Sequence, residues 1–326
     1  MTTEPNDQRN RNEDLIVRIK ESADKLARDG STRGDLKILS RTLRELRYAF
    51  KVFAPYRRNR KVTVFGSART PAENPNYECA VDFGRKMADK GWLVVTGAAS
   101  GIMEAGHFGA GRANSMGLNI MLPFEQAANP VIAGDDKLVH MKYFFTRKLM
   151  FVKECDAVVC LPGGFGTLDE AMEVLTLLQT GKRDMVPVIL LEAEGGDYWK
   201  TLDSFIQKQL LDNGMISPDD LSLYHLTDSV EDAVDHTLQF FRVYHSMRYV
   251  KSKLVMRLSE ELSEEKLAKI NDTFSDVLAG GKFEQTNMLP EEKDEPDLMD
   301  LKRLTFSFNR RSLGRLRQLI DELNEE

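Results

Sequence analysis

A glycine-rich turn between an apolar run and an amphipathic stretch is the central element of this chain. The apolar run, residues 157–161, is short and β-branched, which is typical of a buried strand. The turn contains Pro162, Gly163, Gly164 and Gly166, and apolar residues three or four apart follow it on one helical face (Leu168, Met172, Leu175 and Leu178). Glycines allow N–H groups to approach a ligand closely, and the positive end of the helix points to the same place. The segment therefore predicts an anion site, most often for phosphate, with an ordinary strand–helix turn as the alternative.

Strands and helices alternate over the central part of the chain. The expected strands are residues 62–65, 93–96, 118–122, 137–141, 157–161 and 186–191. The expected helices are residues 77–90, 102–113, 143–154, the helix after the glycine turn, 198–211 and 229–245. This alternation predicts an α/β domain with a parallel sheet flanked by helices, and ligands at the carboxyl ends of the strands. None of the glycine turns has the GxGxxG spacing, which disfavours a dinucleotide site.

The two ends of the chain have different patterns. Apolar residues three and four apart predict a helix over residues 36–53 and, more weakly, another over 15–26. The stripe on the second helix either pairs subunits or packs on its own domain. After about residue 249, a β-α-β-β-α order predicts a small α+β accessory domain. The expected domains are therefore an N-terminal helical extension (1–58), the parallel-sheet domain (59–248) and the accessory domain (249–326).

Charge and cysteine content limit the classes of partner. The chain has 326 residues and a formal net charge of −6, which argues against a general nucleic-acid or membrane-surface binder. Its three cysteines have no metal-ligand spacing and fit a reducing compartment. The N-terminus has no apolar signal segment, and no run approaches the length of a membrane span. We therefore expect a cytoplasmic protein that binds neither nucleic acid nor a membrane.

Charged residues around the glycine turn are candidates for chemistry. Arg147 and Lys148 lie on the helix just upstream, and Glu125 follows an expected strand, where a carboxylate can accept sugar hydroxyls. Glu170 lies early in the central helix. Two of them have a structural alternative: Thr167 and Glu170 match a capping box, Thr-x-x-Glu, and Arg147 can form a surface ion pair.

The motif around the turn resembles that of a known family. Residues 162–170, Pro-Gly-Gly-Phe-Gly-Thr-Leu-Asp-Glu, match the PGGxGTxxE signature of the Lonely Guy (LOG) family, and Arg147-Lys148 stand at the family's spacing ahead of it. The resemblance extends over roughly residues 60–245. It implies a Rossmann-like fold and a homodimer or higher homo-oligomer. It also implies hydrolysis of the N-glycosidic bond of nucleoside 5′-monophosphates, AMP-like or cytokinin riboside 5′-monophosphates, to free base and ribose 5-phosphate.

The resemblance also implies roles for individual residues. Arg147 and Glu170 would be the catalytic pair. The residues that would bind substrate are Gly97, Ser100, Gly101, Glu125, Lys148, Gly163, Gly164, Phe165, Gly166, Thr167 and Thr176. No metal and no cofactor are expected. Family members often carry the label "possible lysine decarboxylase", but no lysine with surroundings suited to pyridoxal phosphate stands out here.

One departure from the family's pattern concerns the pocket. Where relatives commonly have Gly-Gly-Gly-Pro-Gly, this chain has Gly-Ala-Ala-Ser-Gly at residues 97–101. The methyl groups of Ala98 and Ala99 are expected to narrow the pocket or to alter the choice of base.

The implied chemistry suits these residue types. A carboxylate can stabilise an oxocarbenium-like ribose, bind its hydroxyls or activate water, and an arginine can orient it or bind phosphate. Two other function classes stay open at this point. One is a nucleotide sensor that binds without cleaving, and the other is a carrier of a phosphate-bearing cofactor.

Overall fold

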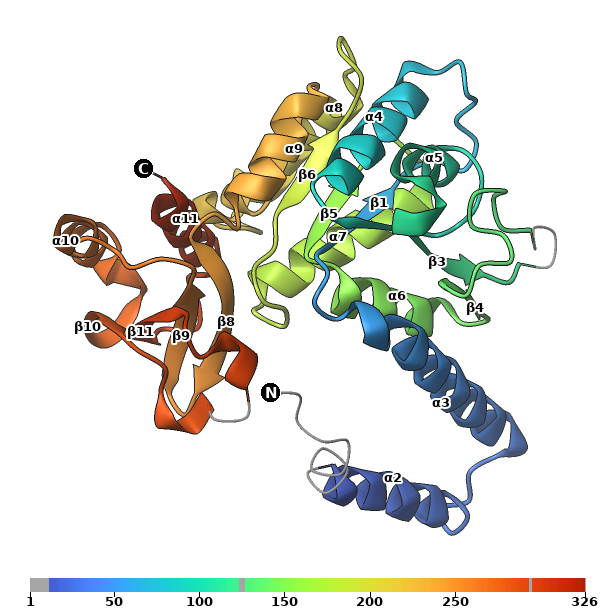
Figure 1. The fold of residues 1–326 in the computed structure, drawn as a ribbon, viewed down its shortest axis with the longest axis horizontal. Coiled ribbons are helices and arrows are strands. Elements are labelled where there is room, and N and C mark those ends of the chain that lie inside the picture. Colours follow the sequence, from blue (N-terminus) through green and yellow to red (C-terminus); the bar gives the residue numbers. More distant parts are fainter. Residues whose placement is uncertain (1–11, 123–126, 293–294, 326) are drawn as a thin grey trace. The chain divides into compact units, whose positions relative to one another are not determined.

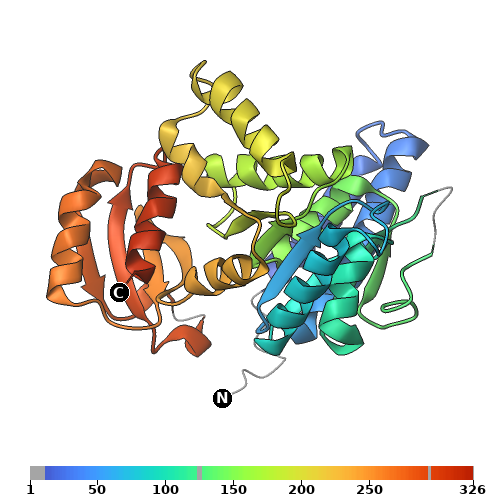
Figure 2. The same ribbon diagram turned by 90° about the horizontal axis from the view of Figure 1, so that it is seen from above.

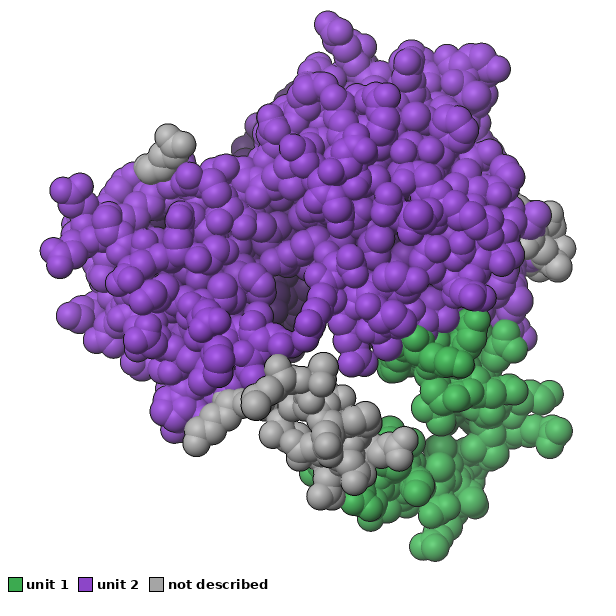
Figure 3. Space-filling model, viewed as in Figure 1, with its two compact units in different colours: residues 1–51 green, residues 52–326 purple. Residues whose placement is uncertain are grey.

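The computed structural model describes residues 12–122, 127–292 and 295–325. The chain divides into two compact units, residues 1–51 and 52–326 (Figure 3). None of the helices in these described ranges is long and apolar enough to cross a membrane.

The first unit is helical. It contains α2 (Glu13–Leu26) and most of α3 (Arg33–Phe53), which confirms the two helices expected from the apolar spacing. Thr32 caps α3: its hydroxyl accepts a hydrogen bond from the Asp35 N–H (3.2 Å), and the Asp35 carboxylate accepts one from the Thr32 N–H (2.9 Å). Three leucines of the stripe are exposed (Leu36, Leu39 and Leu43). Parts of these three side chains are therefore left uncovered by the residues that the structure describes.

A seven-stranded sheet is the centre of the second unit, with the order β4-β3-β2-β1-β5-β6-β7 (Figure 1). All neighbouring strands are parallel. The strands are β1 (Lys61–Phe65), β2 (Leu93–Thr96), β3 (Ser115–Ile120), β4 (Leu138–Met141), β5 (Ala157–Cys160), β6 (Val188–Leu191) and β7 (His225–Thr227). The chain runs outward from β1 in one direction and then continues at β5 on its other side. The predicted parallel α/β fold is therefore confirmed, and its strand order reverses between β1 and β5, where such sheets bind ligands.

Helices cover both faces of this sheet. They are α4 (Pro75–Asp89), α5 (Ile102–Asn114), α6 (Phe144–Glu154), α7 (Phe165–Gln179), α8 (Tyr198–Phe205) and α9 (Val230–Gln239). Helices α4 and α5 lie on one face of the sheet (Figure 2), and their apolar side chains share one core with those of α9 and with Val62 and Val64 of β1. Because side chains alternate along a strand, Phe65 points to the opposite face, where its ring lies 4.9 Å from that of Phe151 on α6.

A second, antiparallel sheet has the order β10-β11-β9-β8. Its strands are β8 (Tyr244–Val250), β9 (Lys253–Leu258), β10 (Leu278–Thr286) and β11 (Lys302–Phe308), with helices α10 (Glu264–Thr273) and α11 (Leu313–Asn324). This confirms the small α+β part, with β8 as an additional strand.

Four local features differ from the expectations. The third strand begins three residues earlier, at Ser115. The helix expected over 198–211 ends as α-helix at Phe205 and continues as a π-helix, Ile206–Leu211. Strand β7 was not predicted, because its three residues are half-buried and carry no apolar run.

The fourth difference concerns residues 240–245, which were expected to continue α9. The helix ends at Gln239, and β8 begins at Tyr244. The Asn324 side chain of α11 accepts hydrogen bonds from the Val243 and Tyr244 N–H groups (2.8 and 3.0 Å) and donates to the Phe240 carbonyl (2.7 Å). This tertiary contact binds backbone groups that a helix would otherwise use.

Candidate active site

A cavity of about 730 Å³ lies at the carboxyl ends of β1 and β5. The residues after β1 form one wall, and the glycine turn with the start of α7 forms another. The lining residues are Phe65–Arg69, Met103, Phe144, Arg147 and Gly163–Glu170. The cavity therefore lies where the strand order reverses and brings together most of the predicted turn and both predicted catalytic residues.

The glycine turn is held against the end of β1. The Ser67 N–H donates to the Pro162 carbonyl (3.2 Å), and the Tyr198 hydroxyl donates to the Gly163 carbonyl (2.6 Å). A Cβ atom on Gly163 would lie 2.1 Å from Thr167 Oγ1, so no side chain fits there. By contrast, a Cβ atom built on Gly164 or Gly166 would meet no atom within 4 Å among the described residues, apart from the adjoining backbone. The first turn of α7 is therefore open to an anion at the positive end of the helix.

Arg147 is held from three sides. Its Nε donates to the Leu118 carbonyl (2.7 Å), and its guanidinium lies 5.1 Å from the centroid of the Phe151 ring. A Cβ atom on Gly97 would lie 2.1 Å from Nη2, so Gly97 is required for Arg147 to occupy this position. Burial lowers the pKa of Arg147, and the nearby Glu170 opposes that shift. The predicted surface ion pair is therefore wrong, because Arg147 lines the cavity beside Glu170.

Glu170 is a buried carboxyl in the cavity wall, with 8 % of its surface exposed. Burial raises its pKa, and Lys148 and Arg147 oppose the shift. Lys148 Nζ lies 3.4 Å from Glu170, 3.0 Å from Asp169 and 2.6 Å from Glu173. Lys148 is thus surrounded by carboxylates next to the cavity, and its predicted contact with substrate stays a prediction.

The capping-box interpretation of Glu170 is wrong. Helix α7 begins at Phe165 with Gly164 as its N-terminal cap, and no side chain caps it. Thr167 lies inside the helix, where its N–H donates to the Gly164 carbonyl (3.0 Å). Glu170 therefore lies beyond the first turn and is not engaged in capping.

Residues 97–101 and the residue after them bind the backbone of the cavity wall that follows β1. The Ser100 hydroxyl donates to the Ala68 carbonyl (2.9 Å), and the N–H of Ile102, after Gly101, donates to the Ser67 carbonyl (3.0 Å). The expectation that Ala98 narrows the pocket is wrong, because its methyl group is fully buried in a separate apolar cluster with Ile132 and Leu138.

Five of the predicted binding residues are not among those that line the cavity: Gly97, Ser100 and Gly101, Lys148, and Thr176. Thr176 is exposed on α7, and its hydroxyl donates to the Met172 carbonyl (2.7 Å) one turn back. Glu125 lies outside the described residues.

Sequence reasoning missed Ser67, Ala68, Arg69 and Met103, which line the cavity, and Tyr198, which binds the glycine turn. Arg69 is exposed, and none of the described residues forms an ion pair with it. Its guanidinium is therefore available to bind a ligand. The Gly66-Ser67 pair at the end of β1 was the sequence feature that could have indicated these residues. It could be interpreted only with the knowledge that β1 pairs with β5.

Comparisons with known proteins identify relatives of this chain. A family described as "Possible lysine decarboxylase" matches residues 97–237. The cytokinin riboside 5′-monophosphate phosphoribohydrolase LOG3 of Arabidopsis thaliana is 33 % identical over 164 residues, 49 % of this chain and 73 % of the relative. The corresponding phosphoribohydrolase of Mycobacterium tuberculosis is 28 % identical over 51 % of this chain and 88 % of its own length. The X-ray structure of TM1055 has 26 % sequence identity and a TM-score of 0.41, and the match covers 55 % of this chain and 99 % of that one. By this similarity to the phosphoribohydrolases, the chain belongs to the LOG family.

Proposed function

We propose that this protein hydrolyses the N-glycosidic bond of nucleoside 5′-monophosphates to free base and ribose 5-phosphate. One observation carries the proposal: an open helix N-terminus and a buried carboxylate belong to the same helix and line the same cavity. Glu170 is five residues from the start of α7, about 7.5 Å along the helix axis. A ligand held at the N-terminus by its phosphate can therefore place its sugar beside the carboxylate.

The phosphate would bind the N–H groups of the first turn of α7, with Arg69 and Arg147 as the nearby cations. This contact is remote from the reacting bond, so its binding energy serves to position the ribose. The substrate class follows from it. A nucleoside without phosphate lacks the anchor and should be a poor substrate.

The carboxylate of Glu170 would act on the sugar. Positive charge develops on the ribose as the bond to the base breaks, and a nearby carboxylate stabilises it or takes a proton from the attacking water. Water supplies the hydroxyl of ribose 5-phosphate and the proton of the released base. Arg147 and Lys148 favour the charged form of Glu170 against the effect of burial.

The test is a panel of AMP, GMP, CMP, UMP and isopentenyladenosine monophosphate beside the matching nucleosides, with free base measured by chromatography. We expect base release from one or more monophosphates and none above background from the nucleosides. Comparable turnover of AMP and adenosine would contradict phosphate anchoring. Binding of monophosphates without base release would instead identify a sensor or a cofactor carrier.

Resemblance to the family also leads us to propose a homodimer or higher homo-oligomer. The exposed leucines of α3 provide apolar surface for such contacts. Light scattering after gel filtration gives the mass directly, and a monomer across micromolar concentrations would refute this part of the proposal.

A further inference from the structure

A second cavity, of about 340 Å³, lies at the amino ends of the parallel strands, opposite the candidate active site. Its walls are formed by residues before β1, β5 and β6 and by the start of β8, namely Arg60, Asp156, residues 182–186 and residues 244–246. The candidate active site lies at the carboxyl ends of the same strands. The two cavities are therefore separated by the length of the sheet.

Positive charge predominates in this cavity. Four cations line it, against two acids: Arg60, Lys153, Lys182 and Arg183, with Asp156 and Asp184. Two of the cations have partners: Arg60 binds Asp156 (2.7 Å), and Lys153 binds Glu154. Burial, followed by Arg60 and Arg257, lowers the pKa of His245 in the cavity wall to about 4, consistent with a positive potential there.

Lys182 and Arg183 are the cations left for a ligand. Lys182 is exposed, and no residue in the described ranges forms an ion pair with it. The Arg183 Nη2 donates to the Cys155 carbonyl, but its Nε is buried and has no hydrogen-bond partner among the described residues. A buried donor without an acceptor is unfavourable, and an anion in the cavity would supply one.

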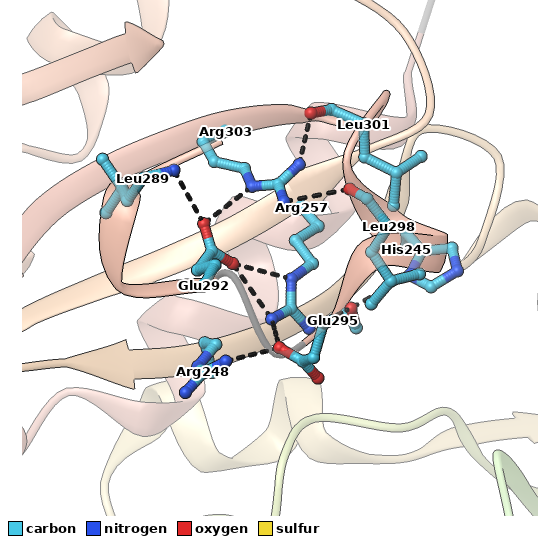
Figure 4. Close-up of polar contacts among 10 residues, drawn as sticks. His245, Arg248, Arg257, Leu289, Glu292, Glu295, Leu298, Leu301 and Arg303 are labelled. Carbon is cyan, nitrogen blue, oxygen red and sulfur yellow. Dashed lines mark hydrogen bonds and ion pairs between the residues drawn. The ribbon is translucent and has the colours of Figure 1, made fainter. Parts of the chain in front are cut away.

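A neighbouring group of arginines has a different, structural role. Glu292, which has no exposed surface, accepts hydrogen bonds from Arg257 Nε (3.0 Å) and Arg303 Nε (2.9 Å) (Figure 4). Arg257 also donates to Ser246 Oγ (3.3 Å), which contacts His245 Nδ1 (2.9 Å). These buried partners fix the β8 wall of the cavity and leave these arginines engaged within the protein.

The cavity also lies at one end of α6, β5 and α7, and the other ends of these three elements form part of the candidate active site. Helix α6 begins near Arg147 and ends at the cavity, β5 runs from the cavity to the glycine turn, and α7 runs from the turn to just before Lys182. The 15 residues of α7 span about 22 Å. A ligand that shifts the ends of these rigid elements can shift Arg147 and Glu170 at their other ends.

We propose that this cavity binds a small phosphate-bearing anion through Lys182 and Arg183 and that it is an effector site separate from the glycine-turn cavity. A guanidinium and an ammonium side by side suit the several oxygens of a phosphate group. The cavity volume is at the lower end of the range for small-ligand sites, which favours a small anion. The binding part does not depend on the proposed function, whereas the effect on base release rests on it.

The test is calorimetric titration of the full chain with inorganic pyrophosphate. The wild type should show two sites, one in each cavity. Lys182→Gln should weaken one of them about ten-fold, and the double variant Lys182→Gln/Arg183→Gln should abolish it, whereas Gly166→Ala should remove the other. Lys208→Gln is the matched control, because Lys208 is an exposed lysine outside both cavities.

Unchanged binding in both Lys182 variants would overturn the site, as would a single wild-type site that only Gly166→Ala removes. The effect on turnover is measured with AMP as substrate. The factor by which pyrophosphate changes the rate of base release should differ between the wild type and the double variant. The basal rate of the double variant should equal that of the wild type. Equal responses to pyrophosphate would overturn the effector role. The titration needs no turnover, so absence of base release would refute the proposed function and leave the binding result standing.

Discussion

Replacing Glu170 with glutamine tests whether its charge serves catalysis or folding. A unit-charge pair at 3.4 Å, the separation of Glu170 and Lys148, is attracted by about 5 kcal/mol at an effective dielectric constant near 20. The pKa of Glu170 is nevertheless raised, so burial disfavours its charge by more than Lys148 and Arg147 favour it. An acid whose folded pKa is raised makes the fold less stable once it ionises. Glu170→Gln should therefore melt no lower than the wild type.

The same substitution should remove most of the base release. Loss of a general base, or of charge beside a cationic sugar, lowers rates by about 10²–10⁴-fold. Glutamine keeps the shape of the side chain and its hydrogen-bonding oxygen, so the loss would report the missing charge.

Glu173→Gln is the matched control. Glu173 lies 2.6 Å from the same Lys148 on the same helix, but it does not line the cavity. Its removal deletes a partly exposed ion pair worth about 0–1 kcal/mol and should leave base release within about two-fold of the wild type. The measurements are thermal melting and initial rates of base release from AMP. Near-normal rates in a folded Glu170→Gln, or equal losses in both variants, would refute the assignment of Glu170.

Three further outcomes are expected. Gly97→Ala should lower base release at least about ten-fold in a folded protein, because its methyl carbon would lie 2.1 Å from Arg147 Nη2; a normal kcat/KM would show that the position of Arg147 does not matter. Gly166→Ala should raise the melting temperature, since alanine stabilises a helix by about 0.5–1 kcal/mol relative to glycine. Its methyl group should also displace the phosphate of the substrate and raise KM, and an unchanged KM would place the phosphate elsewhere. Burial lowers the pKa of His107 to about 4, so the unfolded chain takes up its proton first, and His107 should contribute a fall in stability of about 1.4 kcal/mol per unit as the pH drops from about 6.5 towards 4. Urea denaturation of the wild type and of His107→Gln at each pH measures this contribution as the difference between the two slopes, and equal slopes would contradict a buried neutral His107.

The alternation of strands and helices was predictable because parallel strands are buried on both faces. Such strands appear as mostly apolar runs, as at residues 157–160 and at residues 62–65, which contain Thr63, and every residue of both runs is buried. Strand β7 has no such run because it lies at the edge of the sheet and is only half-buried. Strand order is not a local property either, so the contribution of Ser67 and Arg69 to the cavity could not be predicted.

The position of Arg147 shows a similar limit. The sequence indicated a cation upstream of the glycine turn, but it contained no sign that Gly97, fifty residues earlier, makes room for the guanidinium. Ala98 shows the converse. Its place beside Gly97 suggested a pocket wall, whereas its positive φ of 59° accompanies a methyl group packed against Ile132 and Leu138. Neighbours in the sequence at a strand end can thus face different surroundings.

Two Thr-x-x-acid patterns in this chain have different outcomes, and the difference bears on Glu170. Thr32 and Asp35 form a true capping box, because α3 begins directly after Thr32. Thr167 and Glu170 do not, because Gly164 has the extended backbone of an N-terminal cap and starts α7 two residues before Thr167. Glu170 is consequently too far along the helix to reach a free N–H group, and burial leaves it with a raised pKa in a cavity wall. A carboxyl that is buried at a cost and has no capping role is a strong candidate for a catalytic group, since active sites are where such shifted pKa values gather.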